Sequence, residues 1–171
     1  YTTRRRRPEL GELDVWVLLH GHDGGVSGWA DTAEVGAEVA LWGPRSAAAP
    51  LDVTTRHLMV CDETGVPAVC AIVDGLPDGH PVDVVALVDD EAHRLPVPDR
   101  ASVRWLHRSE VGNSVDVFSD SVRELAGEIV GLYAFGAGES RQISTTRRLL
   151  RHELGAEASQ VHMTGYWRSD G

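Results

Sequence analysis

The stretch Cys61-Asp62-Glu63-Thr64-Gly65-Val66-Pro67-Ala68 decides the fold that we expect for this chain. The apolar run Leu58-Met59-Val60 precedes it, and apolar residues recur at helical spacing between positions 69 and 76. The pattern predicts a strand, a tight turn and a helix. Glu63 or Thr64 would cap the helix, and Pro67 suits its first turn, where the missing N–H would be unpaired in any case.

A helix that begins at the carboxyl end of a parallel strand presents free backbone N–H groups and the positive end of its dipole. This makes the turn at Asp62 to Pro67 a candidate seat for a pyrophosphate. The same pattern occurs as an ordinary strand–helix turn in many α/β proteins. Taken alone, the stretch favours the ordinary turn, so the flanking chain has to decide between the two.

The chain after this turn alternates between strand and helix patterns. Strands are expected at residues 57–61, 81–88, 102–106, 129–135 and 161–165, and helices from the turn to about residue 75, at 115–127 and at 140–154. Nearly continuous apolar strands are typical of strands that are covered on both faces. We therefore expect an α/β fold with an open parallel five-stranded nucleotide-binding sheet and helices on both faces.

Open sheets of this kind bind ligands at the carboxyl ends of their strands. The turn at Asp62, a second glycine turn Gly136-Ala137-Gly138-Glu139, and Arg108 are all expected at that edge. Asp89 and Asp90 follow the second strand, as a ribose-binding acid would. The sequence lacks the G-x-G-x-x-G fingerprint, however, so a solvated loop is the favoured interpretation of these two acids.

The first part of the chain shows a different pattern. Residues 13–19 and 38–42 predict strands, with a glycine-rich loop and a short helix capped by Ser27 between them. Two strands cannot bury a core. We therefore expect the C-terminal part of an antiparallel β-barrel whose first strands are missing. His20 and His22 in the loop are more readily explained as hydrogen-bonded or exposed residues than as metal ligands.

Residues 45–52, with three alanines and Pro50, read as a linker, so the expected domains are 1–50 and 51–171.

The 171 residues carry a net charge of −10, which disfavours general nucleic-acid binding. No signal peptide and no membrane-spanning run is evident, and the two cysteines are too few for a disulfide framework. A cytoplasmic location is expected. The run Arg4 to Arg7 fits either a solvated arm or a phosphate contact.

With these elements placed, the chain resembles the siderophore-interacting proteins, flavin-dependent ferric-siderophore reductases of the ferredoxin-reductase-like group. The matching segments follow one another in family order: Tyr1-Thr2-Thr3-Arg4, His20-Gly21, Gly25-Val26-Ser27-Gly28-Trp29-Ala30, Gly43-Pro44-Arg45, Asp62-Glu63-Thr64, Pro67-Ala68, Trp105-Leu106-His107-Arg108, Ala137-Gly138-Glu139, Arg147-Arg148-Leu149-Leu150 and Gly165-Tyr166-Trp167-Arg168. Cys61, Gly65 and Phe135 depart from the usual family residues, and the arginine that the family places two residues before the tyrosine is absent.

The resemblance implies three groups of site residues. FAD would be held by Tyr1, Thr2, Arg4, His20, Gly25, Val26 and Ser27, and the nicotinamide nucleotide by Asp62, Glu63, Thr64, Pro67, Arg108, Gly138 and Glu139. Arg108 would meet a 2′-phosphate, which favours NADPH slightly over NADH. Arg168 is a weak candidate for substrate contact. Each assignment has a structural alternative, in which Tyr1 and Trp29 are packing residues, Arg108 pairs with Glu110, and Glu139 caps its helix.

The leading hypothesis from the resemblance is an NAD(P)H-dependent enzyme that passes electrons through FAD to a ferric siderophore and releases ferrous iron. It needs neither a catalytic acid nor a resident metal. A second hypothesis is a non-catalytic module that binds the nicotinamide nucleotide without holding FAD. A third keeps the flavin chemistry with another acceptor, such as a quinone. A missing barrel segment or a second copy of the chain is the expected protein partner.

Overall fold

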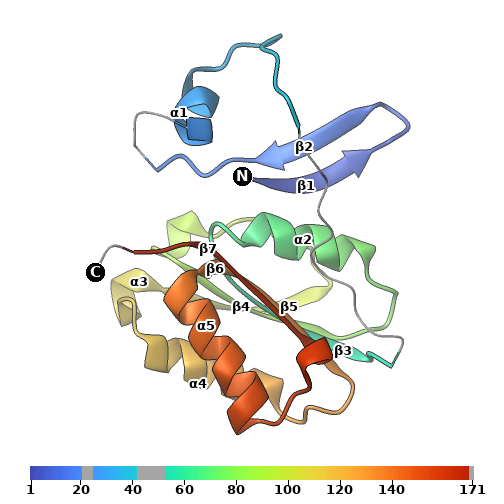
Figure 1. Cartoon of the computed structure of the whole chain (residues 1–171), viewed down its shortest axis with the longest axis vertical. Coiled ribbons are helices and arrows are strands. Elements are labelled where there is room, and N and C mark those ends of the chain that lie inside the picture. Colours follow the sequence, from blue (N-terminus) through green and yellow to red (C-terminus); the bar gives the residue numbers. More distant parts are fainter. Residues whose placement is uncertain (21–24, 42–52, 170–171) are drawn as a thin grey trace.

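The computed structural model describes residues 1–20, 25–41 and 53–169 (Figure 1). His22, Gly43-Pro44-Arg45 and the predicted linker at residues 45–52 lie outside this part of the chain. The division into domains 1–50 and 51–171 therefore stays a prediction.

A five-stranded parallel sheet forms the larger part of the molecule, in the strand order β5-β4-β3-β6-β7. Its strands are β3 (Arg56–Asp62), β4 (Val82–Val88), β5 (Ala101–His107), β6 (Leu132–Glu139) and β7 (Val161–Trp167). The predicted fold class is confirmed. β3 is the first of these strands along the chain and lies at the centre of the sheet, so the turn that follows it opens at the middle of the carboxyl edge.

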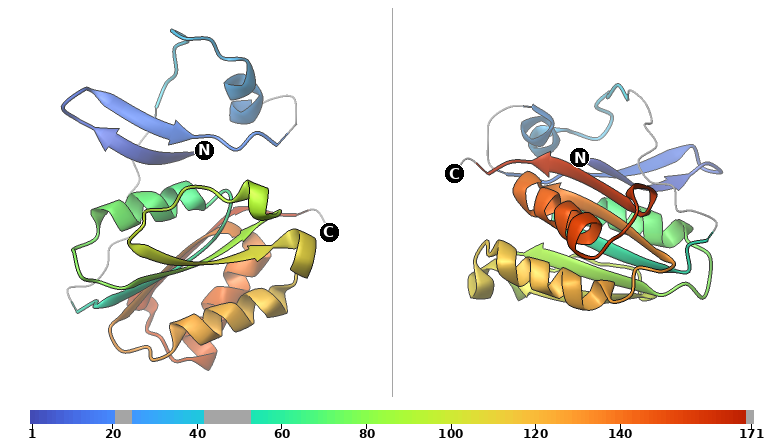
Figure 2. Two further views of the ribbon diagram at one scale, coloured as in Figure 1. Left: turned by 180° about the vertical axis from the view of Figure 1, so that it is seen from behind. Right: turned by 60° about the horizontal axis from the view of Figure 1, so that its bottom comes forward.

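Helices cover both faces of the sheet (Figures 1 and 2). α2 (Val66–Gly75) lies on one face, and α4 (Val115–Ala126) and α5 (Ser140–Arg148) lie on the other. Alternate residues of β3 divide between the two cores: Met59 packs with α2, whereas Leu58 and Val60 pack with α4 and α5. Burial on both faces is why the strand reads as a continuous apolar run.

Two helical details differ from the expectation. A short helix that the sequence pattern did not predict, α3 (Arg108–Val111), directly follows β5. α5 runs on into a π-helical turn at Leu149–Glu153, and Gly155 then adopts a left-handed conformation with φ of 80°. The predicted helix at 140–154 with a glycine stop is therefore present, with its last turn wound more loosely.

The predicted glycine turn at Gly136 to Glu139 is wrong, because these residues are the last part of β6. Gly136 pairs with Val60 of β3 on one side and Met163 of β7 on the other, and Ala137 continues both ladders. A segment that is hydrogen-bonded on both sides stays extended. The glycines serve close packing, since a Cβ at Gly136 would collide with the Met163 side chain.

The first part of the chain forms an antiparallel pair, β1 (Thr2–Arg7) and β2 (Glu12–Trp16), followed by α1 (Gly25–Thr32). β1 packs on the outer side of α2, so α2 lies between the two sheets (Figure 1). The Arg4 guanidinium binds Asp74 of α2 at 2.6 Å and lies over the Trp16 ring. The predicted barrel fragment is thus present as a β-hairpin and a helix.

Two of the predicted boundaries in this part are wrong. The strand expected at residues 13–19 ends at Trp16, and its partner is β1, which the run of charged residues concealed. The strand expected at residues 38–42 is not formed over residues 38–41, the part that the structure describes. Val39 and Leu41 are exposed there, and no described strand lies alongside to complete a ladder.

Cys61 and Cys70 are buried free thiols. Burial raises the pKa of both thiols, which keeps them protonated and unreactive. Among the helices that the structure describes, none has the length and apolar character required to cross a membrane.

Candidate functional site

A buried carboxylate, Asp62, joins three elements at the carboxyl edge of the sheet. Its Oδ1 accepts hydrogen bonds from the backbone N–H of Thr64 at 2.9 Å and from the Thr64 hydroxyl at 2.5 Å. Its Oδ2 accepts from the Glu139 N–H and from the Trp167 indole N–H, both at 2.8 Å. Four donors compensate the loss of water around a side chain that is 1% exposed. Asp62 therefore fixes the ends of β3, β6 and β7 relative to one another.

The backbones meet closely at this point. A Cβ at Gly138 would lie 2.7 Å from Asp62 Oδ2, and a Cβ at Gly65 would collide with the Ala137 carbonyl. Glycine at these two positions allows β6 to approach the turn that follows β3. The predicted site residue Gly138 lies beside Asp62, and its visible role is close packing; its role at a nicotinamide stays a prediction.

The helix cap predicted at Glu63 or Thr64 is wrong. Gly65 occupies the N-cap position of α2 and provides no side-chain cap, because the Thr64 hydroxyl is already bound to Asp62. Pro67 lies buried in the first helical turn, as expected. The amino end of α2 therefore keeps its first-turn N–H groups free of side-chain capping, directly after the carboxyl end of β3.

Arg108 lies between two carboxylates. One guanidinium nitrogen is 2.9 Å from Glu63 Oε2, and another donates to Asp89 Oδ1 at 2.9 Å. Burial lowers the pKa of Arg108, but the contacts with Glu63 and Asp89 outweigh it and raise the pKa above the ordinary value. The expected alternative pairing with Glu110 is wrong, since Glu110 lies 3.4 Å from His107 Nδ1 instead.

Glu139 caps α5, which is the structural alternative that the sequence had left open. Its Oε2 accepts from the backbone N–H groups of Arg141 and Gln142 at 2.7 and 2.9 Å. The other oxygen, Oε1, is buried and has no hydrogen-bond partner among the described residues. The helix cap therefore occupies only Oε2, and Oε1 remains as a hydrogen-bond acceptor at the carboxyl end of β6.

The residues that the resemblance assigned to FAD gather at two places in the hairpin and α1. The His20 backbone N–H donates to the buried Ser27 hydroxyl at 3.2 Å, which ties the loop before α1 to its first turn. Gly25 begins α1 with a φ of 63°, and Val26 is exposed beside it. His20, Gly25, Val26 and Ser27 therefore form one group around the start of α1.

Tyr1, Thr2 and Arg4 form the second group, on β1. The Tyr1 ring is 81% exposed, so the expectation that it packs against the protein does not describe this structure. Burial raises the pKa of Tyr166, and a hydrogen bond with the Thr2 side chain opposes that shift. This contact sets the start of β1 beside the end of β7. Arg4 is held by Asp74, away from Tyr1.

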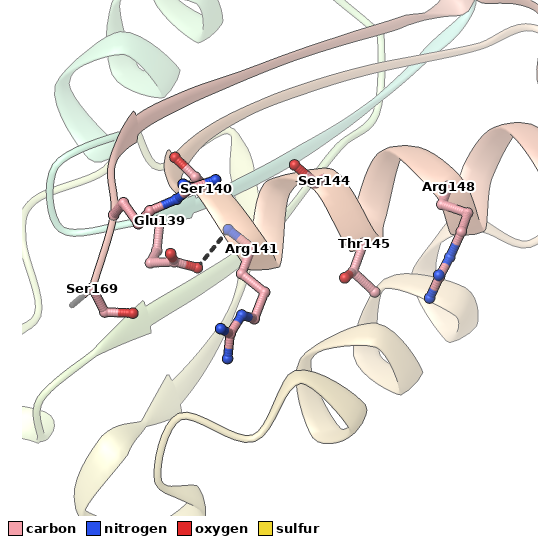
Figure 3. Close-up of a pocket in the computed structure, with 8 residues that line it drawn as sticks. Glu139, Ser140, Arg141, Ser144, Thr145, Arg148 and Ser169 are labelled. Carbon is pink, nitrogen blue, oxygen red and sulfur yellow. Dashed lines mark hydrogen bonds between the residues drawn. The ribbon is translucent and has the colours of Figure 1, made fainter. Parts of the chain in front are cut away.

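A pocket of about 750 Å³ runs from the start of α5 along that helix (Figure 3). Arg141, Thr145 and Arg148 extend from α5 at one-turn spacing. Arg168 and Ser169, which follow β7, also line the pocket. The remaining lining residues are Glu139, Ser140 and Ser144. In the described part of the chain, the guanidinium groups of Arg141, Arg148 and Arg168 have no ion-pair partner, so the pocket is cationic.

Two contributors were missed by sequence reasoning. Trp167 was part of a family segment, but nothing in its spacing showed that its indole reaches Asp62, 105 residues earlier. Asp89 was assigned to a solvated loop, whereas it binds Arg108. The sequence shows its position directly after the second parallel strand, but the absence of the glycine fingerprint favoured a solvated loop over a contact at the site.

The open parallel sheet has a fold similar to that of ferredoxin-NADP+ reductase from Plasmodium falciparum, with a TM-score of 0.52 at 10% identity, covering 66% of this chain and 52% of that one. More narrowly, the model of the siderophore-interacting protein family matches residues 54–170, and that of the siderophore-interacting FAD-binding domain matches residues 1–48. The chain belongs to the siderophore-interacting protein family.

Ferric vibriobactin reductase ViuB of Vibrio cholerae is 28% identical over 98% of this chain and 63% of its own length. The crystal structure of the siderophore-interacting protein SipS from Aeromonas hydrophila has a TM-score of 0.79 and 27% identity, covering 98% of this chain and 71% of that one. The siderophore-interacting protein from Acinetobacter baumannii has a TM-score of 0.83 at 21% identity, covering 99% and 69%. The chain spans 63% of the length of ViuB and of the relative from Mycobacterium bovis, which is 30% identical.

Proposed function

We propose that this protein is an NAD(P)H-dependent ferric-siderophore reductase that uses FAD. The observation that carries the proposal is the Asp62 cluster. It brings the turn after β3, the Gly138-Glu139 end of β6 and the Trp167 end of β7 to one edge of the sheet. In open α/β sheets, that edge binds the ligand. The family membership and the similarity to ferric vibriobactin reductase support the choice of chemistry.

The residues of the hairpin and α1 fit a flavin. Tyr1 offers an exposed aromatic face, and α1 begins at Gly25 beside Val26 and the buried Ser27, where backbone N–H groups favour a diphosphate. When bound, FAD would accept two electrons and deliver them singly. In this proposal Tyr1 packs on the isoalloxazine ring, Thr2 hydrogen-bonds to it, and the residues around Ser27 hold the diphosphate.

The carboxyl edge of the sheet fits a nicotinamide nucleotide. Glu139 Oε1 is a buried acceptor without a partner among the described residues, and an amide N–H donor such as a carboxamide would satisfy it. The uncapped start of α2 at Pro67 lies after the neighbouring strand and suits a pyrophosphate. In this proposal the protein positions the nicotinamide nucleotide against the flavin and excludes water, so no catalytic acid or base is assigned.

The cationic pocket at α5 fits an anionic ferric siderophore. Arg168 lies at the end of β7, next to the Trp167 that binds Asp62, and Arg141 and Arg148 line the same pocket. Guanidinium groups suit carboxylate or catecholate oxygens. The iron leaves after reduction because hard oxygen ligands hold ferrous iron more weakly than ferric iron. We place the activity in the cytoplasm, with residues 1–50 as the flavin side and 51–171 as the nucleotide side.

The test is an anaerobic assay of the purified chain with FAD, a nicotinamide nucleotide, a ferric siderophore and a chromogenic chelator for ferrous iron. Nucleotide-dependent appearance of the ferrous chelate is the expected result. Arg168→Ala should raise the KM for the siderophore and leave the reduction of a small neutral quinone unchanged. Arg151→Ala, which removes an exposed arginine beyond the pocket, is the matched control. No ferrous iron from a folded chain that binds FAD would contradict the proposal.

A second candidate function is a module that binds the nicotinamide nucleotide and takes up FAD only together with a further barrel segment or a second copy. The observation that favours it is that the Asp62 cluster is built entirely by the parallel sheet and the turn after β3, without the hairpin or α1. It predicts nucleotide binding by calorimetry without bound flavin. A flavin that stays with the isolated chain through gel filtration would exclude this second function.

A further inference from the structure

We propose that Glu63 and Asp89 make this site selective for a nucleotide with a free ribose 2′-hydroxyl, NADH, over the 2′-phosphorylated NADPH. The inference rests on the proposed function, because it concerns the ribose end of the same nucleotide site. It reverses the slight preference for NADPH over NADH that Arg108 suggests when only the sequence is considered. The supporting observation is that Arg108 is already bound to two carboxylates in the structure.

Arg108 is the cation that a 2′-phosphate would need, and two carboxylates hold it. Its guanidinium lies 2.9 Å from Glu63 Oε2 and 2.9 Å from Asp89 Oδ1, and its side chain is 16% exposed. A 2′-phosphate would have to share Arg108 with these two carboxylates or displace one of them. Glu63 Oε2 is itself buried, so displacement would leave a carboxylate oxygen without compensation.

The charge around Arg108 is negative. Asp89 and Asp90 directly follow β4, and Asp90 Oδ1 accepts from His93 Nδ1 at 2.7 Å. The hydrogen bond with Asp90 raises the pKa of His93, and the charges of Asp89 and Glu63 add to the shift, so these groups share one electrostatic environment. Asp90, Asp89 and Glu63 thus act on His93, and Glu63, Asp89 and Asp62 act on Arg108. A phosphate dianion would enter this environment against repulsion, whereas a neutral hydroxyl would not.

The position of Asp89 also favours a hydroxyl. In dinucleotide-binding folds that carry the glycine fingerprint, an acid after the second strand hydrogen-bonds to the ribose 2′-hydroxyl of NAD, and Asp89 holds the same place here without that fingerprint. β4 is the second strand of this sheet along the chain, and Asp89 is the first residue after it. The Asp89 side chain binds Arg108 through Oδ1 and is 63% exposed, so Oδ2 remains available as an acceptor.

Isothermal titration of the full chain with NADH and with NADPH, at one ionic strength, tests the inference without any need for turnover. NADH should bind about tenfold more tightly than NADPH or better. Asp89→Asn and Glu63→Gln should each narrow that ratio severalfold, because each frees Arg108 and removes one negative charge. Asp78→Asn, in the exposed turn at the opposite end of β4, should leave the ratio unchanged.

The outcomes separate the inference from the function on which it rests. NADPH binding as tightly as NADH, or more tightly, overturns the selectivity and leaves the proposed function standing. A ratio that Asp89→Asn and Glu63→Gln leave unchanged also overturns it, because other residues would then set the preference. Failure of the folded chain to bind either nucleotide overturns the proposed function and the inference together.

Discussion

The indole N–H of Trp167, at the end of β7, donates to the Asp62 carboxylate at the end of β3 at 2.8 Å. β6 lies between these two strands and contributes the Glu139 N–H to the same oxygen. One buried charge therefore joins three parallel strands at the edge where the nucleotide is proposed to bind. The relative positions of the three strand ends therefore depend on Asp62 and its hydrogen-bond donors.

Trp167→Phe removes one donor to Asp62 and keeps most of the ring. We expect the free energy of unfolding to fall by about 1–2 kcal/mol, because a hydrogen bond to a charged group is lost and the Trp167 side chain is partly reached by water. Denaturant unfolding followed by circular dichroism measures the change. Trp29→Phe, on the exposed side of α1, is the control and should change stability by less than about 0.5 kcal/mol. Equal losses in both variants would contradict the role of Trp167.

Gly138→Ala introduces a Cβ that would lie 2.7 Å from Asp62 Oδ2. We expect a loss of about 1–3 kcal/mol in unfolding free energy, since both the carboxylate and the β6 backbone are held on several sides. Gly75→Ala, at the end of α2 with open space around it, should be neutral or stabilise by up to about 1 kcal/mol. A Gly138→Ala protein as stable as wild type would show that the strand ends can move apart without cost.

His57 predicts how stability depends on pH. Burial lowers its pKa to about 4, and the charges of His80 and Arg100 add to the shift. In the unfolded chain His57 binds a proton near pH 6.5, whereas in the folded protein it does so only near pH 4. The free energy of unfolding therefore falls as the pH is lowered from 7 toward 4. The contribution of this group is about 2–3 kcal/mol.

His57→Gln isolates this contribution, because the carboxylates that titrate in the same range remain in both proteins. The unfolding free energy of wild type should fall more steeply between pH 6.5 and pH 4 than that of the variant. Parallel curves for the two proteins would show that His57 has an ordinary pKa in the folded state.

Arg4 and Asp74 couple the hairpin to α2. Their contact at 2.6 Å leaves Arg4 largely buried, and the Trp16 ring lies beside the same guanidinium. A double-mutant cycle with Arg4→Gln and Asp74→Asn should give a coupling energy of about 0.5–1 kcal/mol. Additive effects of the two substitutions would mean that packing alone holds the hairpin on α2.

The fold was predictable where the local pattern and the tertiary structure agree. β3 and β4 are buried on both faces, so their apolar runs identify them directly. β1 was not predicted because its run of arginines lacks the apolar residues by which a strand is recognised. In the structure its outer face is polar, and on its inner face Arg4 pairs with Asp74. The end of β6 was misread because Gly136 and Gly138 also suit turns, and their real cause is the neighbouring Met163 and Asp62 side chains.

The candidate site was predictable as a set of segments but not as a set of contacts. The order of the segments gathers Asp62, Glu139 and Arg108 at the carboxyl edge of a parallel sheet, and the structure brings the first two together. Contacts between distant residues, such as Trp167 with Asp62, leave no periodicity in the sequence. The partners of Arg108 depend on the conformation of the loop that follows β4, which no local propensity determines.

The most direct test of the central claim is the visible absorption spectrum of the purified chain with FAD, recorded anaerobically before and after a nicotinamide nucleotide is added. The account predicts a protein-bound flavin spectrum that bleaches on addition of the nucleotide and returns when a ferric siderophore is supplied. A folded chain that holds FAD but shows no bleaching with either NADH or NADPH would contradict it.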